Sequence, residues 1–507
     1  MHPYEDAAMS MRYAQNFADG HGIVWNIGEE PLAGSNDFLF IIFVGALKFV
    51  GISIESAVLY LNIFAFLSTL IILYYSLRNI YDAGTLATIF VCLYFIFSPI
   101  LFISSAYFGT ILLTLFVILS WSTALHIIIK KRREIKYYWL FSIATLCMGL
   151  ARSEGCIIAL FMLIAVLFSL DKKEKNKILS IFFFVFLIFG GTYLAWRWSY
   201  FGQPFPSPFY IRGGGNFYFD SLQTSLHNVR KLSWPFLISI FIGFLFQDIR
   251  KLSLQLLLPI FGASAMWMIL SNCEICHGMN FGGRYQFPIL VIVLLSWYPS
   301  AIKIWNHYIK PRVNLLKKQS RLLLSILYSF FLIFILAKEI ESSRKWTRHI
   351  HIKDGRYDVA VMLKKYSKKK YTMAVTEAGL LPLYSKWKAI DTYGYNDSWI
   401  AKNKGITKEY LSKISPEMIM WHEYFSPLSP PKKERVNNSW FKMVKVLQEY
   451  AEENNYILVA IYGVQNDNTH YYYIKSDLHE KDEIISTIRE MDYYWYESGE
   501  ISNNYNE

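Results

Sequence analysis

Long apolar runs dominate the chain between residues 55 and 338, and they alternate with short polar connections. Charged residues are confined almost entirely to those connections. A straight helix needs about 20 apolar residues to cross a bilayer, so the shorter runs predict tilted or broken helices. The predicted spans are 55–77, 84–103, 107–129, 137–152, 155–170, 178–199, 233–247, 252–271, 286–303 and 321–338.

The pattern differs on both sides of this region. The chain opens with an amphipathic stretch whose apolar positions predict a helix lying on a membrane surface. These positions are Ala7, Ala8, Met11, Ala14 and Phe17. After residue 338, strand-like and helical stretches alternate, which predicts a small α/β domain with its own core. We expect three parts: an exported loop with juxtamembrane helices at 1–54, a transmembrane bundle at 55–338 and a soluble α/β domain at 339–507.

Composition supports a polytopic α-helical membrane protein. Of 507 residues, 54% are hydrophobic and 18% charged, whereas soluble domains are about a quarter charged. The net charge of +12 does not indicate a nucleic-acid partner, because much of it lies in short loops between apolar runs rather than on a soluble face. These basic loops are 130–136, 172–177 and 303–321.

Basic loops of this kind mark the cytoplasmic side of a membrane protein. Alternation of the spans then places the remaining polar segments together on the exported side. They are residues 1–54, the turn at 152–154, the loops at 200–232 and 272–285, and the tail after 338. Five cysteines in a chain of this length predict no disulfide framework, and residues 1–20 lack the pattern of a signal peptide.

Two adjacent acids, Glu5 and Asp6, open the first predicted helix. Acids in a first turn are favoured by the helix dipole, so helix capping is one interpretation. The other is catalytic, because a carboxylate at a bilayer surface beside a like charge has the raised pKa that suits a general base. Both interpretations stay open from the sequence.

Arg152 and Glu154 lie where two short apolar segments meet. A charge within a membrane costs about 2.5–3.5 kcal/mol, so such residues are usually paired or functional. The two interpretations are an Arg–Glu pair that closes the turn, and a phosphate ligand at the membrane boundary. A proline-rich loop with Tyr210, Arg212 and three glycines follows at 200–215; it is either a rigid loop with a flexible exit or a phosphate cradle.

The segment CEICHGMNFGGRY, residues 273–285, contains the spacing used for covalent haem attachment. A haem needs a surrounding pocket, whereas this loop is short and lies between two spans, so a disulfide or two thiols fits Cys273 and Cys276 better. His277 and Arg284 are candidates for an acid or a phosphate contact above the next span.

Residues 5–36 read EDAAMSMRYAQNFADGHGIVWNIGEEPLAGSN. This stretch resembles the exported segment DDAxISxRYAxNLxxGxGLVWNxGxxVEGYxN of integral-membrane glycosyltransferases with the GT-C fold, in the branch of the mycobacterial terminal arabinofuranosyltransferase. The acidic pair of that segment falls on Glu5 and Asp6, its arginine on Arg12, and its tryptophan–asparagine on Trp25 and Asn26.

Further segments resemble the same branch in the same order. They are Arg152–Gly155 (RPEG in the family), Tyr200–Arg212 (YYGxxLPNTYYAK), Gly283–Pro288 (GRFLLP) and residues 374–397 (VAVTEAGALPYYS…DxxGLND). Two residues depart from the pattern, since Ala33 stands at an acid and Ser35 at a tyrosine. The family also has a span before its acidic pair, so we expect the in-frame sequence upstream of Met1 to encode about 20 apolar residues.

The resemblance implies a multi-pass protein of the bacterial inner membrane, with its active site and C-terminal domain on the periplasmic side. It implies a polyprenyl-phosphate sugar as donor and an envelope glycan or lipid as acceptor. Asp6 takes the position of the general base, and Glu5 holds Asp6, binds the acceptor or coordinates a divalent ion such as Mg²⁺ or Mn²⁺. The residues expected to bind the donor phosphate or substrate are Arg12, Arg152, Glu154, Tyr210, Arg212, His277 and Arg284.

Three other functions remain open from the sequence. A transporter or flippase of lipid-linked glycans needs ionisable groups near the middle of the bilayer, and the predicted spans carry few. An O-antigen-type polymerase uses a lipid-linked oligosaccharide as acceptor and differs in product length. A membrane-anchored structural or sensor protein would work through its tail domain.

Overall fold

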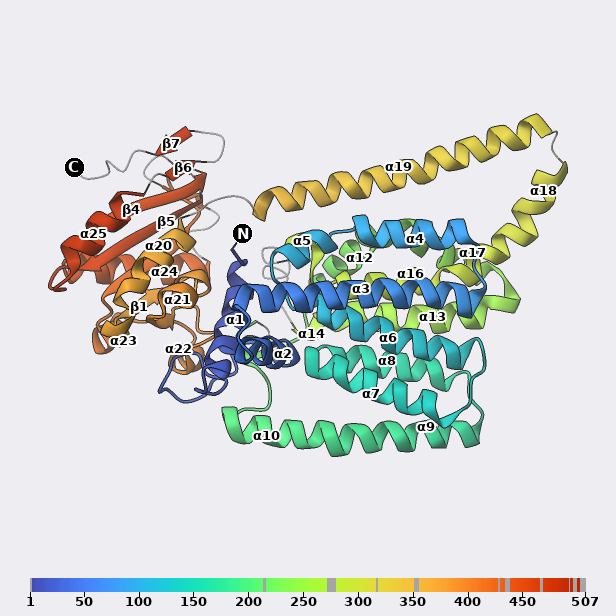
Figure 1. Cartoon of the computed structure of the whole chain (residues 1–507), viewed down its shortest axis with the longest axis horizontal. Helices are drawn as coiled ribbons and strands as arrows, with labels where there is room; N and C mark the ends of the chain where they lie inside the picture. Colours follow the sequence, from blue (N-terminus) through green and yellow to red (C-terminus); the bar gives the residue numbers. More distant parts are fainter. Residues whose placement is uncertain are drawn as a thin grey trace.

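The structure of the protein is a computed structural model. It describes residues 2–212, 216–270, 280–315, 318–350, 355–426, 429–433, 438–465, 468–491, 493–495 and 499–501. Helices form a bundle, and a smaller α/β domain lies at one end of it (Figure 1).

The helices of the N-terminal segment and bundle follow the apolar runs. They are α1 (Glu5–Ala18), α2 (Phe38–Phe49), α3 (Ile54–Tyr81), α4 (Thr85–Phe97), α5 (Ile100–Ser105), α6 (Thr110–Ile128), α7 (Ile135–Ala151), α8 (Gly155–Leu167), α9 (Lys172–Val185), α10 (Gly191–Phe201), α11 (Ser207–Arg212), α12 (Phe219–Ile242), α13 (Gln247–Ala265), α14 (Trp267–Leu270), α16 (Phe287–Ser296), α17 (Tyr298–Ile304), α18 (Lys310–Leu315) and α19 (Lys318–Ile350).

Each of the ten predicted spans overlaps a helix; the interrupted ones include 84–103, 178–199 and 286–303, whereas the shorter spans 137–152 and 155–170 are the single helices α7 and α8. Six helical segments among the described residues are long and apolar enough to cross a membrane, and four shorter apolar helices accompany them. The predicted span 233–247 falls on the second half of α12, which bends at Ser233 just before Pro235. Proline lacks a backbone N–H and clashes with the preceding turn, so it breaks the helix here.

The basic loops lie together at the end of the bundle away from the α/β domain. Arg133 Nη2 donates to the backbone oxygen of Ser169 (3.1 Å) and so joins the loop after α6 to the loop after α8. Lys130 pairs with Asp82 at the end of α3 (3.2 Å). Figure 1 shows α17 and α18 at the same end, with α1 and the α/β domain at the other. The loops that carry the basic residues therefore share one end of the bundle, and α1 and the α/β domain lie at the other (Figure 1).

The C-terminal domain is a three-layer α/β/α unit. Its strands are β1 (Thr372–Val375), β2 (Lys388–Asp391), β3 (Met418–Glu423), β4 (Tyr456–Gln465) and β5 (Asn468–Lys475), and a separate small hairpin is formed by β6 (Tyr493–Trp495) and β7 (Gly499–Ile501). The five-stranded sheet has the order β2-β1-β3-β5-β4; β1 runs parallel to β2 and β3, and β5 antiparallel to β3 and β4.

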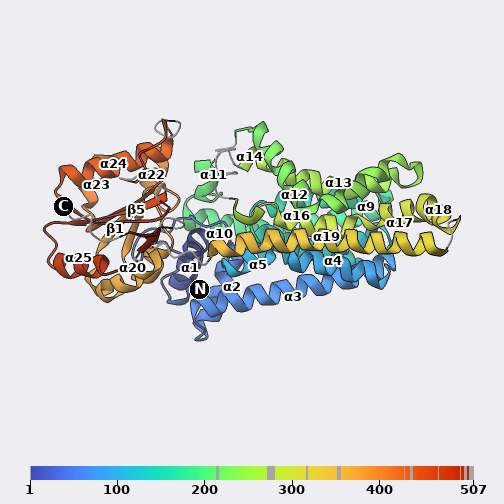
Figure 2. The same cartoon turned by 90° about the horizontal axis from the view of Figure 1, so that it is seen from above.

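Successive residues of β1 enter different cores, because side chains alternate across a strand. One face carries α20 (Arg356–Leu363), α21 (Leu380–Ser385) and α25 (Lys481–Arg489), and the other carries α22 (Ser398–Asn403), α23 (Lys408–Ile414) and α24 (Ser439–Glu453) (Figure 2). The predicted boundary at residue 338 falls inside α19, which continues to Ile350.

The α/β domain docks on the N-terminal segment, and its helix α22 also contacts α11. In both views α1 lies between the sheet and the long helices (Figures 1 and 2). Trp25 Nε1 donates to the backbone oxygen of Ala389 (2.8 Å), and Asn26 Oδ1 accepts from the backbone N–H of the same residue (3.0 Å). Side chains of the N-terminal segment therefore pair with backbone groups of the edge strand β2 and hold the domain at the end of the bundle.

Candidate functional site

A pocket opens where α1, the bundle and the α/β domain meet. Its lining comes from distant parts of the sequence: Asp6 and Ser10 of α1, Asp37 before α2, Arg152 after α7, Arg284 before α16, and Tyr395 of the α/β domain. Pro208 of the loop at 200–232 also lines the pocket, so all five segments predicted on the exported side contribute to it, including three candidate residues, Asp6, Arg152 and Arg284.

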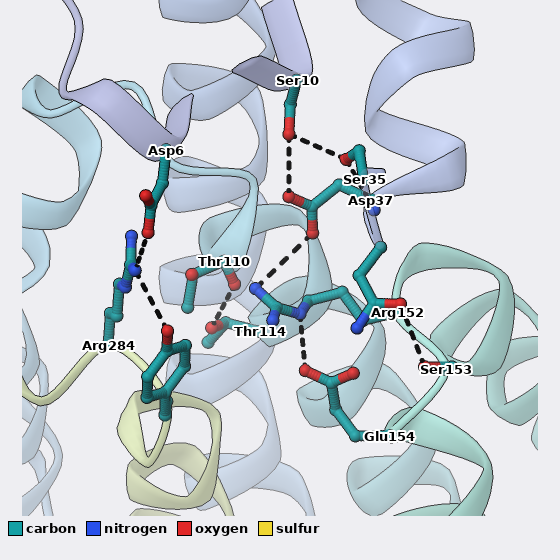
Figure 3. Close-up of polar contacts among 12 residues, drawn as sticks. Asp6, Ser10, Ser35, Asp37, Thr110, Thr114, Arg152, Ser153, Glu154 and Arg284 are labelled. Atoms are coloured by element: carbon teal, nitrogen blue, oxygen red, sulfur yellow. Dashed lines mark hydrogen bonds and ion pairs between the residues drawn. The ribbon is translucent and has the colours of Figure 1, made fainter. Parts of the chain in front are cut away.

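Asp6 and Arg284 form an ion pair in this pocket (Figure 3). The Arg284 side chain is 4% exposed, whereas that of Asp6 is 36% exposed and faces the opening. Aromatic groups fix the guanidinium, which lies 4.2 Å from the centre of the Phe108 ring and donates to the Tyr285 hydroxyl (3.1 Å). The pocket therefore holds a fixed cation beside an accessible carboxylate.

Arg152 is the second cation of the pocket. Its Nε donates to Glu154 Oε1 (2.6 Å), and its Nη1 lies 3.5 Å from Asp37 Oδ1. The turn that holds it requires glycine at position 155, because a Cβ there would lie 2.3 Å from the backbone oxygen of Met148. The Arg–Glu pair that closes the turn is present, and the same guanidinium also reaches the pocket.

Asp37 is a site residue that the sequence analysis did not select. Ser10 donates to its Oδ2 (3.4 Å), and its backbone N–H donates to Ser35 Oγ (3.2 Å). Burial raises the pKa of the Asp37 carboxyl above its ordinary value, and the neighbouring Arg152 opposes that shift. The signal in the sequence was a single acid directly before an apolar helix, which is also a common capping position.

Glu5 turns away from the pocket toward the α/β domain. Its side chain is 8% exposed, lies 3.2 Å from Arg356 Nη1 and accepts from the backbone N–H of Leu380 (3.0 Å). Gly379 is required at this contact, since a Cβ there would lie 2.2 Å from the backbone oxygen of Glu5. The TEAG sequence of the tail is therefore a docking element for the first turn of α1.

Arg12 is also buried at this interface and is absent from the pocket lining. Its guanidinium donates to the backbone oxygens of Trp25 (2.8 Å), Trp387 (2.9 Å) and Pro382, and to Asn26 Oδ1 (3.0 Å). Burial lowers the pKa of Arg12 to about 10, which leaves it charged at neutral pH. These contacts give Arg12 a structural role in docking the domain.

Replacing Arg12 by methionine is expected to loosen the α/β domain without removing a pocket residue. The substitution removes four hydrogen bonds donated by a buried guanidinium, and a hydrogen bond from a charged group contributes about 1.5–3 kcal/mol. Limited proteolysis should then cut between α19 and α20 at lower protease concentration than in the wild type. The control is Arg132→Met, which alters an exposed pair with Glu134 at the other end of the bundle. Equal protection in the Arg12 variant and the wild type would contradict this role.

The predicted divalent ion near Glu5 and Asp6 does not fit the donor set. The two carboxylates point to different arginines, Arg356 and Arg284, and do not converge. Among the residues that the structure describes, no group of three or more His, Cys, Asp or Glu side chains is arranged to hold a metal ion. We therefore derive no step through a metal.

The other predicted residues lie at the edge of the site or outside the described part. Tyr210 on α11 is 44% exposed and packs against Phe205 and Phe209, while Pro208 of the same helix reaches the pocket. Arg212 ends α11. Cys273, Cys276 and His277 lie outside the described residues.

Comparisons with known proteins agree with this architecture. The structure resembles that of ArnT from Cupriavidus metallidurans in the apo state, with a TM-score of 0.55, 12% identity and 93% of each chain covered. For ArnT bound to undecaprenyl phosphate the TM-score is 0.52 at 12% identity, covering 93% of this chain and 94% of ArnT. Archaeal oligosaccharyltransferase AglB from Archaeoglobus fulgidus, in complex with an inhibitory peptide and a dolichol-phosphate, gives a TM-score of 0.50 at 10% identity, covering 94% of this chain and 71% of AglB.

These similarities show that the chain has the GT-C fold, the fold of polytopic membrane glycosyltransferases. Residues 345–476 match a domain of unknown function, DUF8728. No curated protein sequence matches the chain. The resemblance to the mycobacterial arabinofuranosyltransferase branch stays a prediction.

Proposed function

We propose that this protein is a membrane glycosyltransferase that moves a sugar from a polyprenyl-phosphate donor to an envelope glycan or lipid. The observation that carries the proposal is the pocket in which Asp6, Arg152 and Arg284 meet at one end of the bundle. Among the structures with a similar fold, one ArnT structure holds undecaprenyl phosphate and one AglB structure holds a dolichol-phosphate. A lipid phosphate is therefore the donor class that the fold favours.

The two arginines suit the chemistry of such a donor. When the glycosidic bond breaks, the lipid phosphate leaves with an additional negative charge. Fixed cations in a site that excludes water stabilise charge that develops in the transition state. Arg152 and Arg284 are fixed in this way by their carboxylate and aromatic neighbours.

In the proposed reaction Asp6 acts as the general base. The acceptor hydroxyl attacks the anomeric carbon and passes its proton to the Asp6 carboxylate. The new carbon–oxygen bond forms as the bond to the phosphate breaks, so the configuration at the anomeric carbon inverts. The electron pair of the broken bond leaves on the polyprenyl phosphate, and general-base assistance of this kind contributes about 10²–10⁴-fold.

The ion pair between Asp6 and Arg284 links donor binding to the base. A donor phosphate that contacts Arg284 competes with Asp6 for the same guanidinium. Donor binding thereby releases the carboxylate toward the acceptor hydroxyl. The pocket lies at the end of the bundle opposite the basic loops, which by the positive-inside rule supports a reaction at the periplasmic surface of a bacterial inner membrane.

The test is to compare envelope glycans of a deletion strain and its parent by mass spectrometry, with the purified protein assayed in parallel in lipid nanodiscs. We expect one glycan to lose a single sugar, and the purified protein to transfer that sugar from its polyprenyl phosphate. Movement of a lipid-linked glycan across liposomes without any change in glycan structure would instead establish a transporter. Products that grow by whole oligosaccharide units would establish a polymerase.

A further inference from the structure

Asp37, whose side chain is 16% exposed, has longer side-chain contacts than the neighbouring carboxylates Glu154 and Glu5. Glu154 accepts a hydrogen bond of 2.6 Å and Glu5 one of 3.0 Å, whereas the side-chain contacts of Asp37 are 3.4 Å to Ser10 and 3.5 Å to Arg152. Its Oδ1 is buried and accepts no hydrogen bond from any residue within the described ranges. A buried carboxylate with unfilled acceptor capacity costs free energy that a donor from a ligand regains.

The groups around Asp37 favour a neutral ligand with hydroxyl groups. Arg152, whose Nη1 lies 3.5 Å from Asp37 Oδ1, attracts a phosphate, whereas the Asp37 carboxylate itself repels a phosphate and accepts a hydrogen bond from a hydroxyl. Ser10 and Ser35 are hydrogen-bonded to each other (2.9 Å) at the same wall, and each hydroxyl can both donate and accept (Figure 3). One side of the pocket therefore presents the Asp37 carboxylate and the hydroxyls of Ser10 and Ser35. Arg284 lies on the other side (Figure 3).

The spacing along α1 relates this wall to the proposed base. Asp6 and Ser10 are four residues apart, so they share one helix face and are separated by about 6 Å along the axis. That separation is comparable to the width of a sugar ring. A sugar whose anomeric carbon faces Asp6 thus brings one of its other hydroxyl groups to Ser10 and Asp37.

We propose that Asp37, with Ser10 and Ser35, binds a hydroxyl group of the donor sugar and determines which sugar the protein accepts. This inference rests on the proposed function, because it takes the pocket as the donor site. The ligand is a sugar with a free hydroxyl on the ring edge that faces Asp37. A sugar without that hydroxyl leaves the carboxylate unpaired, and a site built to bind a hydroxyl rejects such analogues strongly.

The experiment measures binding to the full-length protein in nanodiscs by calorimetry. The probes are undecaprenyl phosphate alone, its glucose, galactose, mannose and arabinose derivatives, and monodeoxy analogues of the derivative that binds best. The wild type should prefer one derivative and bind one of its deoxy analogues at least about 100-fold more weakly. Asp37→Asn should bind undecaprenyl phosphate at least as tightly as the wild type, because Arg152 loses a competing carboxylate, and should lose most of the discrimination between the sugar and that analogue.

Asp19→Asn is the matched control, since Asp19 pairs with Lys48 at the far end of α1 and is absent from the pocket lining. It should keep both the affinity and the discrimination. Ser10→Ala and Ser35→Ala should each reduce the discrimination by a smaller factor. If Asp37→Asn does not fold, the two serine variants provide the test. A wild-type ratio between the affinities for the sugar derivative and its deoxy analogue in both variants overturns the proposal.

The outcomes separate this inference from the proposed function. Equal losses for undecaprenyl phosphate and for its sugar derivatives in Asp37→Asn would overturn the sugar subsite and leave the donor class intact. A wild-type protein that binds undecaprenyl phosphate but prefers none of its sugar derivatives would also overturn the sugar subsite and leave the donor class intact. A wild type that binds none of the probes would contradict the proposed function itself.

Discussion

Replacing Asp6 by asparagine is expected to lower the rate of sugar transfer by about 10²–10⁴-fold while donor binding persists. Asparagine keeps the size of the side chain and still accepts a hydrogen bond from Arg284, but it does not take the proton of the acceptor hydroxyl. Transfer of labelled sugar from the polyprenyl phosphate by protein in nanodiscs measures the effect. The loss should appear in kcat, because the interaction is made in the transition state.

The control for this variant is again Asp19→Asn, which removes an acid from the same helix outside the pocket. Its activity should match that of the wild type. Glu5→Gln separates the two adjacent acids, since Glu5 contacts Arg356 and Leu380 of the α/β domain. The main effect of Glu5→Gln should be weaker docking of the α/β domain rather than a slower chemical step. Wild-type activity in folded Asp6→Asn would refute the assignment of the base.

Replacing Arg152 by glutamine is expected to destabilise the protein by about 3–5 kcal/mol. The substitution leaves Glu154 and Asp37 buried without their shared cation, and breaking a buried ion pair from one side is costly. Thermal unfolding in detergent should show a large fall in melting temperature. The matched control is Arg132→Gln, which breaks a pair of the same spacing with Glu134, and the median value of such exposed pairs is only about 0–1 kcal/mol.

A double variant separates the structural role of Arg152 from its role toward phosphate. Arg152→Gln combined with Glu154→Gln removes both members of the closest pair and should recover much of the lost stability. Under the proposed function it still binds undecaprenyl phosphate more weakly than the wild type, because one of the two pocket cations is missing. Wild-type affinity in the folded double variant would show that Arg152 only closes the turn between α7 and α8.

The membrane architecture was predictable because burial in lipid leaves a strong signal in the sequence. Apolar runs, basic loops and the return of charge after the last span each follow from the cost of placing charges in a bilayer. The α/β character of the tail was also readable, because strand-like and helical stretches alternate after residue 338, and the structure has both helices and strands there. The predicted boundary at 338 missed the continuation of α19, since a helix that leaves a membrane does not have to end there.

The site was only partly predictable. Arg152 was selected because a charge within a membrane is costly, and Asp6 and Arg284 were selected by their positions at predicted membrane boundaries and by the resemblance. Asp37 was missed because an acid before a helix has an ordinary explanation, and Tyr395 was missed because nothing in the sequence placed its loop against α1. Arg12 was selected by resemblance, yet its hydrogen-bond partners show that it joins the N-terminal segment to the α/β domain.

The sequence by itself determined the spans, their polarity and the end of the bundle where the polar residues gather, because hydrophobic burial and charge depend on local composition. The tertiary structure decided which of those residues share a pocket. Glu5 and Asp6 are neighbours in the chain, but consecutive residues on a helix point about 100° apart, so one faces Arg356 and the other Arg284. The packing of α1 between the bundle and the α/β domain therefore decides that one of these two adjacent acids faces the domain and the other the pocket.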